Sequence, residues 1–267
     1  MAEKPDFIRS SAATRLRTAP NPGPFTLEGT NSFIIGGHGG SVIVDPGGTV
    51  IVDPGPLDLP HLRLLAAAGP VGLVLITHRH PDHTAASEEF RRMTGAPVRA
   101  MDPAFCHGAA PLEDGEEFVA GGIRIAVIAT PGHTSDSVSF HLPDDGPTGS
   151  VLTGDTILGR GTTVISPPDG ALGGYLESIA RLSGLGAATV LPGHGPVLPD
   201  LAATCEVYLA HRHRRLDQVR AAVATLGEAA SVAAVTAIVY STIDPLLRHG
   251  AELSVAAQLD YLNSRSA

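Results

Sequence analysis

The sequence predicts a layered α/β fold, because short β-branched runs alternate with helical patterns over most of its 267 residues. Hydrophobic residues make up 43% of the chain, which is enough for a sizeable core. The chain has no Trp and only 4% aromatic residues, so this core must consist mainly of Ala, Val, Leu and Ile. The length fits one substantial domain, or a domain with a small appendage.

Local patterns predict the individual elements of the first 199 residues. The segment 1–30 is rich in proline and is expected to be a loop. Apolar residues at helical spacing predict helices at 60–68, 84–94 and 174–183. β-Branched and apolar runs bounded by turn residues predict strands at 32–35, 42–44, 50–52, 71–76, 97–100, 117–119, 122–129, 137–141, 150–153 and 188–191.

One eight-residue segment occurs twice in tandem. Residues 41–48 and 49–56 share the pattern Val-Ile-Val-Asp-Pro-Gly. A single repeat is too short for a solenoid, so we interpret it as a duplication that lengthens a strand or hairpin. The sequence leaves open which copy holds the register of the core.

After Pro199 the pattern becomes helical. Residues 200–226 predict a long amphipathic helix, and 230–265 predict short helices split by turns at Asp244-Pro245 and His249-Gly250. We therefore expect a main domain at 1–199 and a C-terminal helical segment at 200–267 that docks on it as a cap.

Charge and cysteine content restrict the class of protein. The net charge of −9 argues against a broad basic surface for duplex DNA or anionic lipid. Cys106 and Cys205 lie far apart, and two buried free thiols are typical of a reducing cytosol. The N-terminus has no apolar signal core and no apolar run is long enough to span a bilayer. A cytoplasmic location is expected.

Histidine and aspartate residues follow several of the predicted strands. The run Thr77-His78-Arg79-His80-Pro81-Asp82-His83 comes directly after the apolar segment 71–76. His133, Asp155 and His194 each follow a glycine in a turn after an apolar strand. Imidazole is a preferred zinc ligand, and a carboxylate adds the negative charge that a second cation needs. Seven ligands, one of them a carboxylate shared by both ions, would be enough to bind two metal ions.

These motifs, in this order, resemble the metallo-β-lactamase superfamily: His-x-His-x-Asp-His, Pro-Gly-His-Thr, Thr-Gly-Asp and Pro-Gly-His-Gly. The resemblance covers roughly residues 20–200 and implies a four-layer αββα sandwich with a dinuclear metal site at one edge of its two sheets. It implies two Zn²⁺ ions, with Mn²⁺ or iron as alternatives. By motif, the first metal would be held by His78, His80 and His133, the second by Asp82, His83 and His194, with Asp155 as the bridge.

Two further segments resemble one branch of that superfamily, which has a winged-helix-like C-terminal segment. They are residues 21–31 and the stretch from Tyr208 to Arg215. Members of this branch include a mitochondrial endoribonuclease and polyketide thioesterases, so the branch implies no single substrate. The complete ligand set resembles the glyoxalase II and ribonuclease branches. Zinc β-lactamases of subclass B1 use Cys where this chain has Asp155, which weakens the expectation of β-lactamase activity.

Three residues are expected to support the ligands. The family carries an Asp at a strand end near the metals, and here either Asp45 or Asp53 matches it. We favour Asp53, because Pro54-Gly55-Pro56 leads straight into the next predicted helix. Thr77 and Thr134 adjoin ligands and either hydrogen-bond to them or cap turns.

Other polar residues are weaker candidates. Arg160 and Tyr175 are candidate substrate contacts, with a solvated loop arginine and a packed tyrosine as the ordinary interpretations. The basic cluster 211–215 is a solvated helix face or a phosphate contact, and we favour the former. The other histidines are expected at the surface or in the core: His38, His61, His107, His141, His211, His213 and His249.

The predicted function is a dinuclear zinc hydrolase in which a metal-bridging hydroxide attacks a small or carrier-bound thioester, lactone or ester. Asp82 would both bind metal and orient the nucleophile. The first alternative is a metal-dependent endoribonuclease or phosphodiesterase, and β-lactamase activity is a weaker one. A diiron redox protein or an inactive scaffold is a third. We expect RNA as an alternative partner, no duplex DNA and no membrane, and a C-terminal segment that serves as a lid or a homodimer surface.

Overall fold

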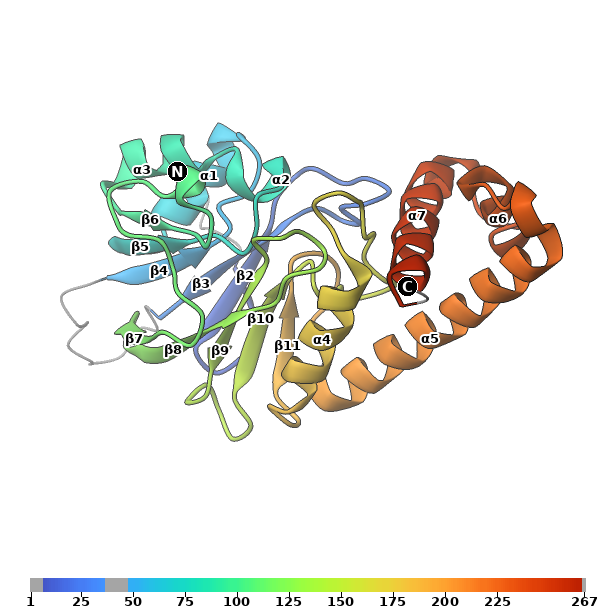
Figure 1. Cartoon of the computed structure of the whole chain (residues 1–267). Coiled ribbons are helices and arrows are strands. Elements are labelled where there is room, and N and C mark those ends of the chain that lie inside the picture. The colour runs from blue at the N-terminus through green and yellow to red at the C-terminus, as the bar shows by residue number, and fades with distance from the viewer. Residues whose placement is uncertain (1–6, 37–47, 266–267) are drawn as a thin grey trace.

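The computed structural model describes residues 7–36 and 48–265. Two mixed β-sheets pack face to face in its centre (Figure 1). The first sheet runs in the order β1 (Ile8–Arg9), β2 (Thr14–Thr18), β3 (Asn31–Ile35), β4 (Thr49–Val52), β5 (Val71–Leu75) and β6 (Val98–Arg99). The second runs in the order β11 (Thr189–Pro192), β10 (Ser150–Gly154), β9 (Val138–Leu142), β8 (Ile123–Ala129) and β7 (Glu117–Ala120).

Helices cover the outer face of each sheet, as Figure 1 shows. On the first sheet lie α1 (Leu59–Ala66) and α3 (Ser87–Thr94), whose Leu62 and Phe90 pack against Ile51 of β4. On the second lies α4 (Leu172–Ser183), and its Ile179 belongs to the same buried cluster as Val151 of β10. These layers confirm the predicted four-layer αββα sandwich.

Alternation along β4 explains how one strand serves two cores. Val50 and Val52 face the second sheet, whereas Ile51 faces the helices on the other side. The strand belongs to the second copy of the tandem repeat, so this copy holds the register of the core. The strand predicted at 42–44 lies outside the described residues.

The C-terminal segment is helical throughout residues 201–264 apart from short turns. It contains α5 (Leu201–Leu226), α6 (Val232–Val239) and α7 (Arg248–Ser264), with 3₁₀ turns at Gly227–Ala229 and Pro245–Leu247. The first turns of α5 pack on the second sheet, whereas its later turns share a small core with α6 and α7. The helical segment is thus confirmed, and its separation into a domain at 200–267 stays a prediction.

Several boundaries differ from the prediction. The segment 1–30 contains β1 and β2 and is not only a loop, because β2 pairs along its whole length with β3. The predicted turn at His249-Gly250 is wrong, since both residues lie inside α7. The helix predicted at 84–94 begins three residues later, as α3, and a separate single turn, α2 (Pro81–Thr84), precedes it. No helix in the described part of the chain is long and apolar enough to cross a membrane.

Candidate metal centre

The predicted ligands meet at one edge of the two sheets. His78 and His80 follow β5, and Asp82 and His83 lie on the single turn of α2. The others follow β8, β10 and β11 respectively: His133, Asp155 and His194. Because several strands end at this edge, loops from distant parts of the sequence bring their side chains to one place.

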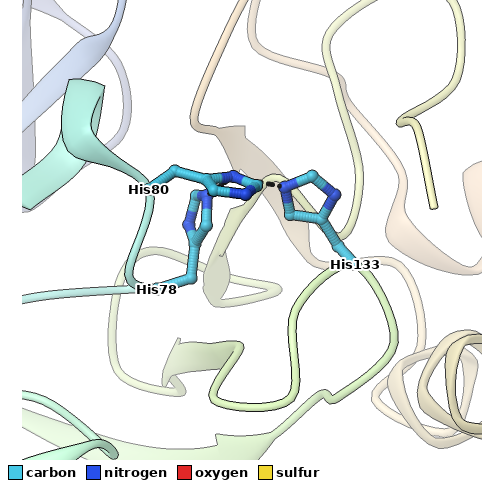
Figure 2. A group of neighbouring side chains, drawn as sticks. All are labelled: His78, His80 and His133. Carbon is cyan, nitrogen blue, oxygen red and sulfur yellow. Dashed lines mark hydrogen bonds between the residues drawn. The ribbon is translucent and has the colours of Figure 1, made fainter. Parts of the chain in front are cut away.

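Three imidazole rings form the first group, which Figure 2 shows. Nδ1 of His80 lies 3.0 Å from Nε2 of His78 and 3.0 Å from Nε2 of His133. Nitrogen ligands about 2.0–2.1 Å from one tetrahedral zinc ion would lie roughly 3.3 Å apart. The three nitrogens therefore have the mutual spacing of a metal site.

The second group combines two imidazoles with a carboxylate. Nε2 of His83 lies 3.2 Å from Nε2 of His194. Oδ2 of Asp82 lies 3.4 Å from the first of these nitrogens and 3.2 Å from the second. The same three residues satisfy the spacing of a metal-binding cluster.

Asp155 lies between the two groups. Its Oδ2 is 3.3 Å from Nε2 of His194 and 3.8 Å from Nε2 of His133. Its Oδ1 is 3.6 Å from Nε2 of His83, yet this buried oxygen accepts no hydrogen bond from the described residues. An unsatisfied buried carboxylate oxygen requires a cation or a donor, and its central position fits a shared ligand.

Hydrogen bonds behind the rings determine which nitrogen faces the cluster. Carbonyl and carboxylate oxygens only accept, so an Nδ1 that contacts one carries the proton, and in the neutral ring the lone pair then lies on Nε2, which faces the cluster. Three rings are held in this way: His83 donates to Asp53 Oδ2 at 2.8 Å, His133 to Val164 O at 2.7 Å, and His194 to Gly29 O at 3.1 Å.

Asp53 orients ligands of both groups. Its Oδ2 accepts hydrogen bonds from Nδ1 of His83 and from Oγ1 of Thr77, and its Oδ1 accepts one from the backbone N–H of Thr77. Thr77 Oγ1 in turn lies 3.0 Å from Nδ1 of His78. Asp53 is 2% exposed and has a left-handed φ of +52°, which a non-glycine residue rarely adopts. Asp45, the alternative candidate, lies outside the described residues.

The charges of the cluster fit a cation. Burial lowers the pKa of His78 and of His133, so these rings are neutral and present lone pairs. Burial would raise the pKa of the Asp155 carboxyl, but the neighbouring histidines, His194 first, hold it well below its usual range. Burial opposes a charge on His194 too, yet Asp155 beside it raises that pKa to about 9. The carboxylates thus stay ionised and draw positive charge to the point where metal ions would supply it.

A cavity of about 570 Å³ opens directly onto this cluster. Its lining includes His80, Asp82, His133, Asp155 and His194. The remaining walls are mainly apolar and come from the loops at 24–27 and 158–166 and from residues 240–254 of the C-terminal segment. His249 lines this cavity as well, although its sequence context indicated no role.

The weaker predictions have mixed outcomes. Thr77 contacts a ligand, whereas Thr134 only holds its own turn through a 2.7 Å hydrogen bond with Ser137. Arg160 lines the cavity at its exposed side, where it forms an ion pair with Glu28. Tyr175 is not a substrate contact: it is fully buried, and its hydroxyl donates to Thr156 O at 2.8 Å.

Several contributors to the site were not predicted, and three of them lie next to one another. Thr163 Oγ1 lies 2.9 Å from Nδ1 of His133, and Val164 O accepts the hydrogen bond from that nitrogen. Arg212, in the supposedly solvated basic cluster, is buried and lines the cavity. The sequence carries no signal for these roles, because each depends on contacts between segments more than 25 residues apart.

Comparison with known proteins agrees with the geometry. The family model described as "Metallo-beta-lactamase superfamily" matches residues 25–194. A "Beta-lactamase-like protein 2 homolog" from Caenorhabditis elegans is 30% identical over 77% of this chain and 69% of its own length. An "Atrochrysone carboxyl ACP thioesterase" from Aspergillus aculeatus is 32% identical over 76% of this chain and 62% of its own.

Solved structures extend the likeness in fold beyond the matched family region. A beta-lactamase domain protein from Burkholderia ambifaria has a TM-score of 0.79 at 22% identity, covering 99% of this chain and 91% of that one. A metallo-beta-lactamase family protein from Thermus thermophilus has a TM-score of 0.77 at 22% identity, covering 96% and 94%. Among the curated relatives above and a "Lactamase-like protein nscB" of Neosartorya fischeri, the matched part spans 58% to 69% of the relative's length.

Proposed function

This chain belongs to the metallo-beta-lactamase superfamily, and from that premise we propose that it is a dinuclear zinc hydrolase of acyl thioesters, free or carried by a protein. The observation that carries the proposal is the mainly apolar cavity that opens onto the cluster of imidazoles and carboxylates. Relatives named as carboxyl ACP thioesterases support the thioester as the reacting group. A divalent metal is implied by the family itself and fits the residues described above.

The proposal assigns each ligand a role. His78, His80 and His133 would hold one ion, Asp82, His83 and His194 the other, and Asp155 would contact both. Bound zinc supplies a water whose pKa lies near 7 and polarises the carbonyl oxygen of the substrate.

Asp82 is the residue we propose for proton transfer. Its side chain is 27% exposed, compared with 11% for Asp155, and it lines the cavity. Thr30 Oγ1 donates a hydrogen bond of 3.2 Å to its Oδ2 and orients the carboxylate. Asp82 is therefore the more accessible of the two carboxylates that line the cavity, and we propose that it accepts the proton that an attacking water loses.

The apolar walls would bind the acyl group. Phe25 and Leu27 approach from the N-terminal loop, and Ile243, Leu247 and Leu253 approach from the C-terminal segment. Burying an acyl chain there would exclude bulk water from the reacting carbonyl. We propose that the segment 200–267 is a cap that selects the acyl group.

The basic cluster that suggested a ribonuclease does not form one continuous surface. Arg212 is buried, and Arg215 stacks on the ring of Tyr240 at 4.4 Å from its centroid, while His213 and Arg214 are exposed. This division gives RNA little extended positive surface. We therefore place thioesters ahead of RNA as substrate.

The test is metal analysis together with a panel of substrates. We expect about two zinc ions per chain, and we expect hydrolysis of acyl thioesters that a chelator abolishes and zinc restores. The panel also contains a lactone, a β-lactam, a phosphodiester and an unstructured RNA. Turnover of RNA without turnover of thioesters, or a site that binds iron alone, would overturn the proposal.

A further inference from the structure

Arg212 is a cation enclosed in the wall of the cavity. It lies on α5, is 4% exposed and lines the same cavity as the cluster of predicted ligands. The sequence favoured a solvated helix face for it, and the structure corrects that interpretation. A buried arginine normally has an anionic partner, because removing its charge from water costs several kcal/mol.

The contacts of Arg212 leave its charge without such a partner. Nη2 donates a 2.7 Å hydrogen bond to Thr163 O, and the guanidinium lies 4.7 Å from the ring centroid of Tyr175. Its Nε is buried and has no hydrogen-bond partner. Within residues 7–36 and 48–265, no carboxylate lies within 4.0 Å of the guanidinium.

Two arginines elsewhere in the chain show the usual arrangement. Arg79 contacts three carboxylates, those of Asp102, Asp136 and Asp169, and Arg160, which also lines the cavity, pairs with Glu28. The most deeply buried guanidinium of the cavity lining is thus the one that has no carboxylate beside it. Its planar N–H groups are suited to bind two oxygens of one anion.

We propose that Arg212 recognises an anionic group of the substrate, and so determines which acyl thioesters are hydrolysed. This inference rests on the proposed function, because it names the substrate of the same site. The anion is a carboxylate on the acyl group or a phosphate on the carrier arm, since both present paired oxygens to a guanidinium. An uncharged acyl group would leave the cation without compensation.

A purely structural role is the alternative that the experiment must separate. Arg212 contacts Thr163, whose Oγ1 lies 2.9 Å from Nδ1 of His133. Removing the guanidinium could therefore displace a predicted metal ligand and slow every substrate equally. Anion recognition, in contrast, affects only substrates that carry the charge.

The kinetic test compares Arg212→Met and Arg212→Lys with Arg214→Met, a control on the exposed face of the same helix. One substrate pair is a glutaryl and a pentanoyl thioester of the same small thiol. A second pair joins one neutral acyl group to thiols with and without the phosphate of the pantetheine arm. The pair in which the wild-type protein prefers the charged member identifies the source of the anion.

In that pair, Arg212→Met should lose about 10- to 100-fold in kcat/KM for the charged member, mainly through KM. The neutral member should change by less than about 3-fold, because no charge-assisted hydrogen bond is lost. Arg212→Lys should lose an intermediate amount, since it keeps the charge without the planar fork. Equal losses for both members, together with lost metal, would show a structural role and overturn the inference.

A binding measurement makes the inference independent of turnover. Calorimetric titration compares dicarboxylates from succinate to sebacate with monocarboxylates of equal length on the metal-loaded wild-type protein and on the variants. We expect the second carboxylate to increase affinity about 10-fold or more at one chain length in the wild-type protein and not in Arg212→Met. If no thioester is hydrolysed but this gain is present, the proposed function fails and the inference stands. No gain at any length in the wild-type protein would refute the recognition of a carboxylate by Arg212. Titration of pantetheine with and without its phosphate tests the recognition of a phosphate in the same way.

Discussion

The cluster of predicted metal ligands and the wall of the cavity are built in opposite ways. The cluster uses short loops that each follow a strand, and four of its seven predicted ligands lie within six consecutive residues, 78–83. The wall combines a loop near the N-terminus, the loop at 158–166 and helices beyond residue 200. The sheet edge thus supplies the predicted ligands, whereas the two loops and the helical segment together supply the apolar walls beside them.

Removing the shared carboxylate should have the largest effect. Asp155→Ala takes away the predicted ligand that lies between the two groups, so we expect thioester hydrolysis to fall by about 10³-fold or more and metal content to fall with it. Asp144→Ala, at an exposed ion pair with Arg124, is the control. Assays of kcat/KM and metal analysis check the result, and near-normal turnover with full metal content would rule out the assigned role.

A smaller loss should follow from weakening the support behind the ligands. Asp53→Asn keeps a side chain that tolerates the left-handed φ of +52° but replaces an accepting oxygen with an N–H₂ group. Nitrogen at the Oδ2 position would remove the acceptor of both Thr77 Oγ1 and His83 Nδ1, and nitrogen at the Oδ1 position would remove that of the Thr77 backbone N–H. We expect the change to reduce zinc affinity or activity about 10- to 100-fold. Competition with a zinc chelator measures the affinity. Asp58→Asn, which preserves the N-cap of α1, should leave it unchanged.

Changing the wall should alter substrate choice without altering the metal. A Cβ at Gly250 would lie 2.9 Å from Cε1 of Phe25 and 3.2 Å from Cγ2 of Val164. Gly250→Ala should therefore shift both apolar side chains and weaken the binding of bulky acyl groups about 10-fold, while short acyl groups are hydrolysed at the normal rate. Gly173→Ala is a matched control, because the nearest atom to its Cβ would be 3.6 Å away. A parallel loss for all acyl lengths would contradict this assignment.

The smallest effect is expected at the exposed side of the cavity. Arg160 and Glu28 form an ion pair in which both side chains are more than half exposed, so solvent screens it. Arg160→Gln should change kcat/KM by no more than about 5-fold for any thioester. A much larger loss that is confined to anionic substrates would instead show that Arg160 binds them, as the sequence weakly predicted.

The difference between the ligand cluster and the cavity wall also explains which features of the structure the sequence could predict. The sheets, the layering and the convergence of the predicted ligands depend on local patterns, such as apolar runs that end in Gly-His or Gly-Asp. The turn predicted at Gly250 is wrong, because this glycine lies inside α7. Its lack of a side chain leaves room for Phe25, which packs against the helix at that position. The burial of Arg212 depends on Tyr175 and Thr163, which are 37 and 49 residues away in the sequence, so no local pattern could indicate it.

The chain of contacts from Arg212 through Thr163 to His133 has a thermodynamic consequence. It joins the wall of the cavity to a predicted ligand of the first ion through one residue. If an acyl anion that docks on Arg212 changes the affinity for that ion, linkage requires the ion to change the affinity for the anion by the same factor. The protein would then bind its two ligands as coupled effectors, and the zinc supply of its surroundings would help to determine how tightly it holds its substrate.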